Sequence, residues 1–121
     1  MIRFIHCMKA RSDVSLESFR SFWHSPEFNQ QLSELAIQAG TRQIRRNLTL
    51  QVDTNNQLQM ERGAEPPYDA ILEVWFDHAA GLQNIAENSE VQELLQRMEQ
   101  LQADYVDFQA SKRFFTEWSE D

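Results

Sequence analysis

The segment from Tyr68 to Asp77 restricts the possible folds more than any other part of this sequence. Every second side chain is apolar, as in a β-strand whose successive residues point to opposite faces. The residues between them also include large apolar side chains. One face carries Ala70, Leu72, Val74 and Phe76, and the other carries Asp69, Ile71, Glu73 and Trp75. This strand is therefore predicted to need a cover on both faces.

Three further segments show the alternation of strands, namely residues 2–9, 41–52 and 112–118. Residues 53–67 are polar and contain Gly63 and two prolines, which is typical of a long exposed connection between strands. The sequence thus predicts four strands.

Helical spacing of apolar residues fills the remaining segments. Pro26 cannot continue a helix from before it, so the first helical region is predicted to be broken there. The predicted boundaries are an N-cap at Ser15, a second start at Ser25 and Pro26, an end at Gly40, a short helix capped by Asp77, and a last helix that begins with a capping box of Ser89 and Gln92.

The order of these elements is strand, helix, strand, strand, helix, strand. Right-handed crossovers turn this order into an α+β, ferredoxin-like domain with a four-stranded antiparallel sheet and its helices on one face. One such domain is predicted to span residues 1–121. Alternation places Phe4, Met8, Leu72, Val74, Phe76, Phe114 and Trp118 beneath the helices, and Arg3, Ile5, Cys7, Ile71, Glu73, Trp75, Arg113, Phe115 and Glu117 on the other face.

The face without helices is too apolar to be left in water, because monomers rarely expose a large contiguous apolar patch. An identical sheet from a second copy, packed with two-fold symmetry, is the simplest cover. The sequence therefore predicts a homodimer. The alternative is that the long connection or the C-terminal tail covers this face.

Charge and composition exclude several classes of function. The net charge of -8 argues against nucleic-acid binding, because phosphates attract basic surfaces. Arg42, Arg45 and Arg46 are interpreted as a solvated strand edge or an interface, with an anion site as the alternative. No apolar run approaches a membrane span, and the first residues do not resemble a signal peptide. A single cysteine, Cys7, favours a cytoplasmic protein.

Several motifs resemble those of the EthD family. They are Leu16-Glu17-x-Phe19-x-x-Phe22-Trp23, Gly40-Thr41-Arg42, Asn88-Ser89-Glu90-Val91, Asp104-Tyr105-Val106-Asp107 and, most specifically, Tyr68-Asp69-x-Ile71-x-Glu73-x-Trp75-Phe76-Asp77. The resemblance covers nearly the whole chain and implies a dimeric α+β barrel with a cleft between sheet and helices. Related dimeric barrels include cofactor-free monooxygenases, polyketide cyclases, a lactone isomerase and haem-degrading enzymes. In one departure, His24 follows Trp23 directly, whereas many members have three residues between these positions.

Two polar residues are the candidate catalytic groups. His6 lies between Phe4 and Met8 on a predicted central strand, where an imidazole could carry protons in the cleft. Tyr68 begins the neighbouring strand, and the resemblance to cyclases implies a His and Tyr pair. The alternatives are a histidine satisfied within the core and a tyrosine that caps the core.

Four more residues are predicted to bind the ligand: Phe22, Trp23, His24 and Phe76. The alternative for the aromatic residues is ordinary core packing. No metal site and no cofactor are predicted, because the three histidines are scattered and no glycine-rich phosphate loop is present. The function predicted is binding of a small, largely apolar molecule in the cleft, with cofactor-independent oxidative, cyclase or isomerase chemistry as an extension. A non-catalytic dimeric accessory or stress-response module is the alternative.

Overall fold

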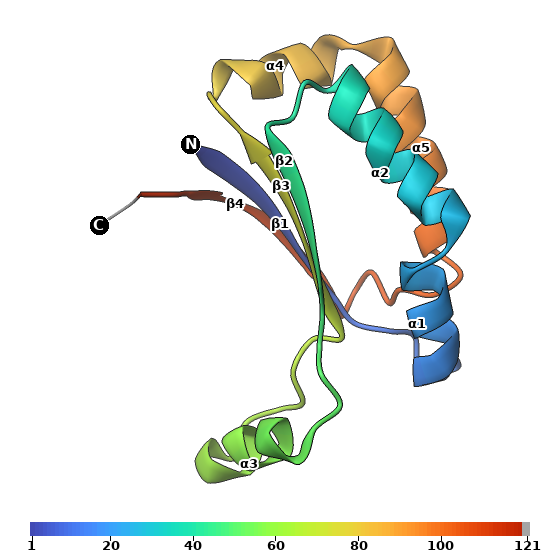
Figure 1. The fold of residues 1–121 in the computed structure, drawn as a ribbon, viewed down its shortest axis with the longest axis vertical. Coiled ribbons are helices and arrows are strands. Elements are labelled where there is room, and N and C mark those ends of the chain that lie inside the picture. Colours follow the sequence, from blue (N-terminus) through green and yellow to red (C-terminus); the bar gives the residue numbers. More distant parts are fainter. Residues whose placement is uncertain (120–121) are drawn as a thin grey trace.

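The computed structural model describes residues 1–119 and contains one antiparallel sheet of four strands (Figure 1). The strands are β1 (Ile2–Met8), β2 (Gln43–Leu48), β3 (Ala70–Phe76) and β4 (Lys112–Glu117), and their order across the sheet is β2-β3-β1-β4. The two central strands are thus β1 and β3. This arrangement confirms the predicted α+β, ferredoxin-like fold.

Helices α1 (Leu16–Trp23), α2 (Pro26–Gln38) and α5 (Ser89–Gln102) lie on one side of the sheet, and α4 (Ala80–Glu87) connects β3 to α5 (Figure 1). The predicted starts of α1 and α2 are confirmed. Ser15 Oγ accepts a hydrogen bond from the Ser18 amide at 3.0 Å, and Ser25 Oγ accepts one from the Phe28 amide at 3.2 Å. Gly40, with φ of +62°, provides the left-handed turn that follows α2.

The predicted caps of α4 and α5 are wrong. Asn88 rather than Ser89 caps α5, because its Oδ1 accepts hydrogen bonds from the amides of Glu90 and Val91. Asp77 lies too far before α4 to reach its first turn and instead forms an ion pair with Arg42 at 2.9 Å. At α5 the polar residues Asn88 and Ser89 stand next to each other, so the residue types alone do not determine which one is the cap, and at α4 the N-cap position is Ala79, which has no side-chain cap.

The exposed connection predicted for residues 53–67 contains a helix, α3 (Asp53–Arg62). None of its residues is buried, and Gly63 ends it with φ of +61°. In Figure 1 this helix stands apart from the sheet and from the other helices. A helix with no buried residue needs no apolar stripe, so periodicity could not reveal α3.

The two faces of β4 are the reverse of those predicted. In an antiparallel pair, directly opposite residues share a face, and β4 pairs with β1 so that Phe115 lies opposite Phe4 and Arg113 opposite His6. Arg113 and Phe115 are therefore on the side with the helices, while Phe114 and Trp118 are on the open side. Phe114 and Phe115 are adjacent and equally apolar, so alternation could not decide between them.

The core lies between the sheet and helices α1, α2 and α5. Its largest fully buried side chains are Trp23, Phe19, Phe28, Met8, Leu94 and Val91. Phe22 stacks on Tyr105 with ring centroids 4.6 Å apart and on Phe28 at 4.9 Å. These aromatic contacts fill the space near α1. Toward α4 the space between sheet and helices is not filled.

Candidate functional site

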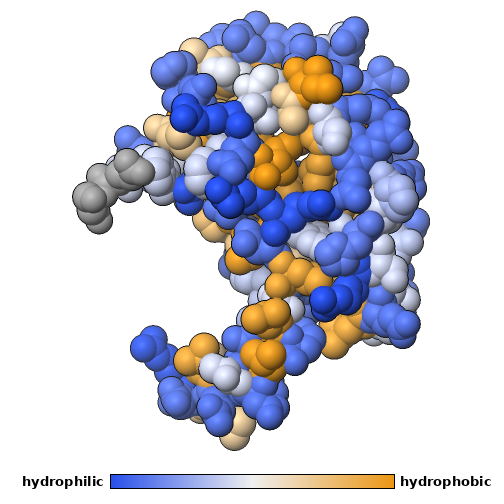
Figure 2. Space-filling view, in the orientation of Figure 1, coloured by the Kyte–Doolittle hydropathy of each residue, from blue (hydrophilic) through white to orange (hydrophobic). Residues whose placement is uncertain are grey.

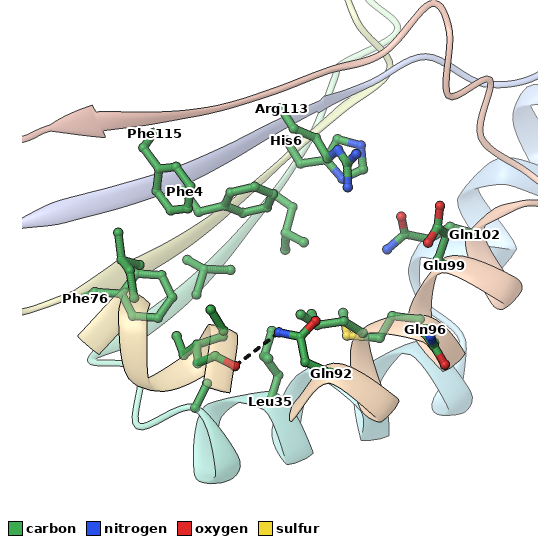
Figure 3. A pocket seen from close by; sticks show the side chains of 18 of the residues that line it. Phe4, His6, Leu35, Phe76, Gln92, Gln96, Glu99, Gln102, Arg113 and Phe115 are labelled. Atoms are coloured by element: carbon green, nitrogen blue, oxygen red, sulfur yellow. Dashed lines mark hydrogen bonds between the residues drawn. The ribbon is translucent and has the colours of Figure 1, made fainter. Parts of the chain in front are cut away.

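A cavity of about 500 Å³ lies between the sheet and helices α2, α4 and α5. Figure 2 shows apolar side chains inside this hollow and hydrophilic side chains around it. The sheet supplies one wall and the helices the other, as Figure 3 shows from close by. A volume of this size is within the range of small-molecule sites, which is roughly 300–1,000 Å³.

Most of the cavity wall is apolar. Central strands β1 and β3 present every second side chain to it, because the strand period of two places these residues on the face beneath the helices. The helices add branched side chains from their inner faces. The apolar lining residues are Phe4, Leu72, Val74, Phe76 and Phe115 from the sheet, and Leu35, Ala39, Leu82, Ile85, Ala86, Leu95, Met98 and Phe108 from the rest of the chain.

Four of the polar lining side chains gather at one end of the cavity, while Gln92 and Gln96 line it from elsewhere on α5. In Figure 3 the side chains of His6 and Arg113 lie side by side on the sheet, and Glu99 and Gln102 face them from α5. Ser111 also lines the wall. His6 is 5% exposed and Gln102 is 6% exposed, whereas Arg113 and Glu99 are exposed. The cavity thus has an apolar body and a small polar end.

The imidazole of His6 is neutral at physiological pH. Burial, and secondarily the positive charge of Arg113, lowers the pKa of His6 to about 4. Within residues 1–119, no group hydrogen-bonds to this imidazole. A ligand in the cavity would therefore meet a ring that can both donate and accept a hydrogen bond.

Gln92 joins two of the helices that surround the cavity. Its Nε2 donates a hydrogen bond to the carbonyl oxygen of Ile85 at 3.1 Å, drawn as the dashed line in Figure 3. This contact ties the end of α4 to the first turn of α5. Gln92 therefore has a structural role beside its place in the lining.

Two of the six residues predicted for the site, His6 and Phe76, line the cavity. The other four do not. Phe22 and Trp23 are 3% and 2% exposed and belong to the aromatic core around Phe28, as the alternative interpretation states. His24 is the exposed residue at the end of α1.

Tyr68 precedes β3 and is partly buried outside the cavity. Its carbonyl oxygen accepts a hydrogen bond from Thr49 Oγ1 at 2.5 Å. The predicted pairing of Tyr68 with His6 assumed that both lie along one strand face. In the sheet, the residue opposite His6 is Leu72, four positions further along the chain.

The sequence interpretation missed the polar residues that stand around His6. The sequence predicts Arg113 and Phe115 on the open face, because the adjacent Phe114 and Phe115 are equally apolar and alternation does not separate the two faces of β4. Glu99 and Gln102 lie on α5 beside its apolar stripe, where polar residues normally face water. One signal was available: Gln102 is one helical turn after Met98, which is itself part of that stripe.

The three arginines that cluster in the sequence have separate contacts. Arg42 pairs with Asp77, Arg46 donates to the carbonyl oxygen of Trp23 at 3.2 Å and to Asn29, and the guanidinium of Arg45 lies 5.4 Å from the ring of Trp75. They do not form a common anion site.

In the described part of the chain, no group of three or more His, Cys, Asp or Glu side chains is arranged to hold a metal ion. No helix within residues 1–119 is long and apolar enough to cross a membrane.

The open face of the sheet carries an aromatic and cationic cluster. Trp75 and Trp118 stack with ring centroids 5.8 Å apart. The guanidinium of Arg3 lies 3.9 Å from the Trp75 ring and 4.9 Å from the Trp118 ring, and it approaches Glu73 at 3.5 Å. Phe114 is 46% exposed on the same face.

A known structure has the same fold over nearly the whole chain. It is a dimeric protein of unknown function with a ferredoxin-like fold from Bacteroides fragilis NCTC 9343, with a TM-score of 0.63 and 15% sequence identity, covering 97% of this chain and 95% of that one. At this identity the likeness establishes the fold alone. No curated protein sequence matches the chain.

The family is established from the sequence. The model of the EthD domain matches residues 11–109, which include α1, α2, the specific motif on β3, and α5. This confirms the resemblance seen in the motifs. The chain belongs to the EthD domain family.

Proposed function

We propose that this protein binds a small, largely apolar molecule in the cavity between the sheet and helices α2, α4 and α5. The observation that carries the proposal is the cavity itself: about 500 Å³, with apolar walls and a buried, neutral His6 at its polar end. Concave apolar sites with a few convergent polar groups are typical of small-molecule binding. A two- or three-ring compound fits within this volume.

The neutral imidazole supports a reaction as well as binding. Its ring nitrogen can accept a hydrogen bond from a bound enol, phenol or activated C–H group, and it becomes a stronger base for proton transfer when a bound negative charge raises its low pKa. Cofactor-independent oxidation by molecular oxygen, which would accept the electrons, and cyclisation or isomerisation of an enolisable compound can each begin with a proton transfer of this kind. In this proposal His6 is the catalytic residue, and Phe76 and the other apolar lining residues hold the ring system.

The open face of the sheet supports a homodimer. Ile5, Ile71, Trp75, Phe114 and Trp118 are on this face, and no helix of the described chain covers it (Figure 1). Covering this surface with a second copy removes apolar area from water, which contributes roughly 25 cal/mol per Å². The dimeric structure with the same fold is consistent with this assembly.

A second candidate function is a dimeric accessory module that acts through protein contacts. The observation that favours it is α3, which exposes Leu58 (59%) and Met60 (78%) and has no buried residue. Exposed apolar side chains on a projecting helix can contact another protein. This function does not need an empty cavity, so ligand binding separates the two candidates.

The experiment titrates the protein with N-phenyl-1-naphthylamine, a neutral apolar dye that fluoresces in apolar sites. Ala39→Trp places a large side chain in the cavity wall and is expected to abolish the fluorescence increase. Ile37→Trp is the matched control, because Ile37 is 82% exposed on the same helix. Absence of dye binding to the native protein, or equal binding by Ala39→Trp, would refute the proposed cavity ligand.

A further inference from the structure

We propose that the ligand of this cavity carries a carboxylate on its apolar body and that Arg113 binds this carboxylate. The inference rests on the proposed function and specifies its ligand class. It is based on the charges that line the cavity, on the contacts that Arg113 does and does not make, and on the position of Arg113 beside His6.

Only two charged side chains, Arg113 and Glu99, are among the described residues that line the cavity at neutral pH. Arg113 lies opposite His6 in the register of β1 and β4, at the polar end. Glu99 lies across the hollow on α5 (Figure 3). The polar end is therefore positive on the sheet side and negative on the helix side.

Arg113 has no acidic partner within residues 1–119. Arg3, Arg42 and Arg97 each form an ion pair, with Glu73, Asp77 and Glu34 respectively. Neither an ion pair nor a side-chain hydrogen bond connects the guanidinium of Arg113 to another described residue. Its guanidinium is thus available to a group that enters the cavity.

A carboxylate fits this position better than a neutral or cationic head. Guanidinium and carboxylate form two parallel hydrogen bonds, which fix the orientation of the carboxylate as well as attract its charge. The buried amide of Gln102 can donate to the same group. Glu99 repels an anion, so the carboxylate is expected on the side of Arg113, with the rings toward Phe76.

His6 provides an independent readout of this placement. The positive charge of Arg113 contributes to the low pKa of His6. A carboxylate bound to Arg113 offsets that charge and raises the pKa of His6, whereas a neutral ligand of the same shape does not. Glu99 is the other charged group at this end. It is present with either ligand, so it does not contribute to the difference between them.

The test compares 2-naphthoate with 2-naphthamide, which have the same rings and nearly the same shape but differ in charge. Calorimetric titration of the native protein at pH 7.5 should give a Kd at least about tenfold lower for the naphthoate. Arg113→Gln is expected to remove this preference while naphthamide binding persists. Arg113→Lys should retain part of it, and Glu99→Gln should strengthen naphthoate binding by about two- to threefold.

Proton NMR titration of His6 completes the test and does not depend on any variant. Saturating 2-naphthoate should raise the pKa of His6, and saturating 2-naphthamide should leave it near its value in the free protein. The inference is overturned if naphthamide binds as tightly as naphthoate, if Arg113→Gln keeps the preference, or if naphthoate leaves His6 unchanged. In each of these cases the neutral dye and naphthamide would still bind. The carboxylate proposal would then fail while the proposed binding function stands, so the two failures are distinguishable.

Discussion

The two faces of the sheet carry similar side chains but form different surfaces. On the side with the helices, β1 and β3 place apolar residues against an aromatic core near α1, and the layers separate toward α4 to leave the cavity. On the open side, Trp75 and Trp118 stack around Arg3 and stay partly exposed. The composition of a face therefore does not determine whether it becomes core, cavity or open surface. What lies opposite each face determines it.

The adjacent residues Phe114 and Phe115 of β4 show the difference between the two faces, because they lie on opposite sides of the sheet. Both are about half exposed, at 46% and 56%. Phe115 packs against Phe4 with ring centroids 5.4 Å apart and lines the cavity, whereas Phe114 is on the face with Trp118. Each side of the sheet can thus be changed separately, with the other side as its control.

The largest expected effect is on the filled part of the helix side. Trp23→Ala removes the largest fully buried side chain, between Phe19 and Phe28, and should lower the free energy of unfolding by about 3–5 kcal/mol. Urea denaturation measures this loss. Leu16→Ala, at an exposed position of α1, should cost less than about 1 kcal/mol. If Trp23→Ala lowers the free energy of unfolding only slightly and abolishes dye binding, Trp23 belongs to the ligand site, as the sequence predicts.

The next effect concerns the open side. Phe114→Glu places a charge in the proposed dimer interface and should raise the dissociation constant of the dimer by at least about 30-fold. Sedimentation velocity at micromolar concentrations measures the change. Phe115→Glu should leave the dimer intact and weaken binding of the neutral dye. The reverse result, a monomer from Phe115→Glu and a dimer from Phe114→Glu, would place the interface on the helix side.

The third prediction uses the buried His6. In the unfolded chain His6 takes up a proton near its ordinary pKa of about 6.5, while the folded protein resists protonation until about pH 4. Folding stability should therefore fall as the pH drops from 6.5 to 4, by up to about 3.4 kcal/mol, and this loss should be absent in His6→Gln. Comparing the two proteins across this range cancels the carboxylates that they share. If the free energies of unfolding of the native protein and of His6→Gln change in parallel with pH, the imidazole of His6 is not shielded from water.

The sequence was sufficient for features that local patterns determine. Period-two alternation identified β1 and β3, and the Ser25-Pro26 pair identified the break between α1 and α2. His6 and Phe76 were found because they lie on central strands, whose two faces differ in what covers them. The EthD motifs gave the same fold independently.

The rest depended on tertiary contacts that local patterns do not contain. The register of β4 against β1 decided that Arg113 and Phe115 face the cavity, although adjacent phenylalanines left both faces equally apolar. Tyr68 was misplaced because β3 begins at Ala70. The cavity arises where α4 and α5 leave space above the sheet, and no periodicity encodes such a gap.

The smallest expected effect is on α3, which neither face of the sheet buries. Leu58→Ala should change the free energy of unfolding by less than about 0.5 kcal/mol, because Leu58 is 59% exposed and its helix has no buried residue. Leu94→Ala, the same substitution at a fully buried position of α5, should cost about 2–5 kcal/mol in the same urea titration. A loss above about 1 kcal/mol for Leu58→Ala would mean that α3 packs against a second copy. The open face would then be only part of the dimer interface, and Phe114→Glu alone would not separate the subunits.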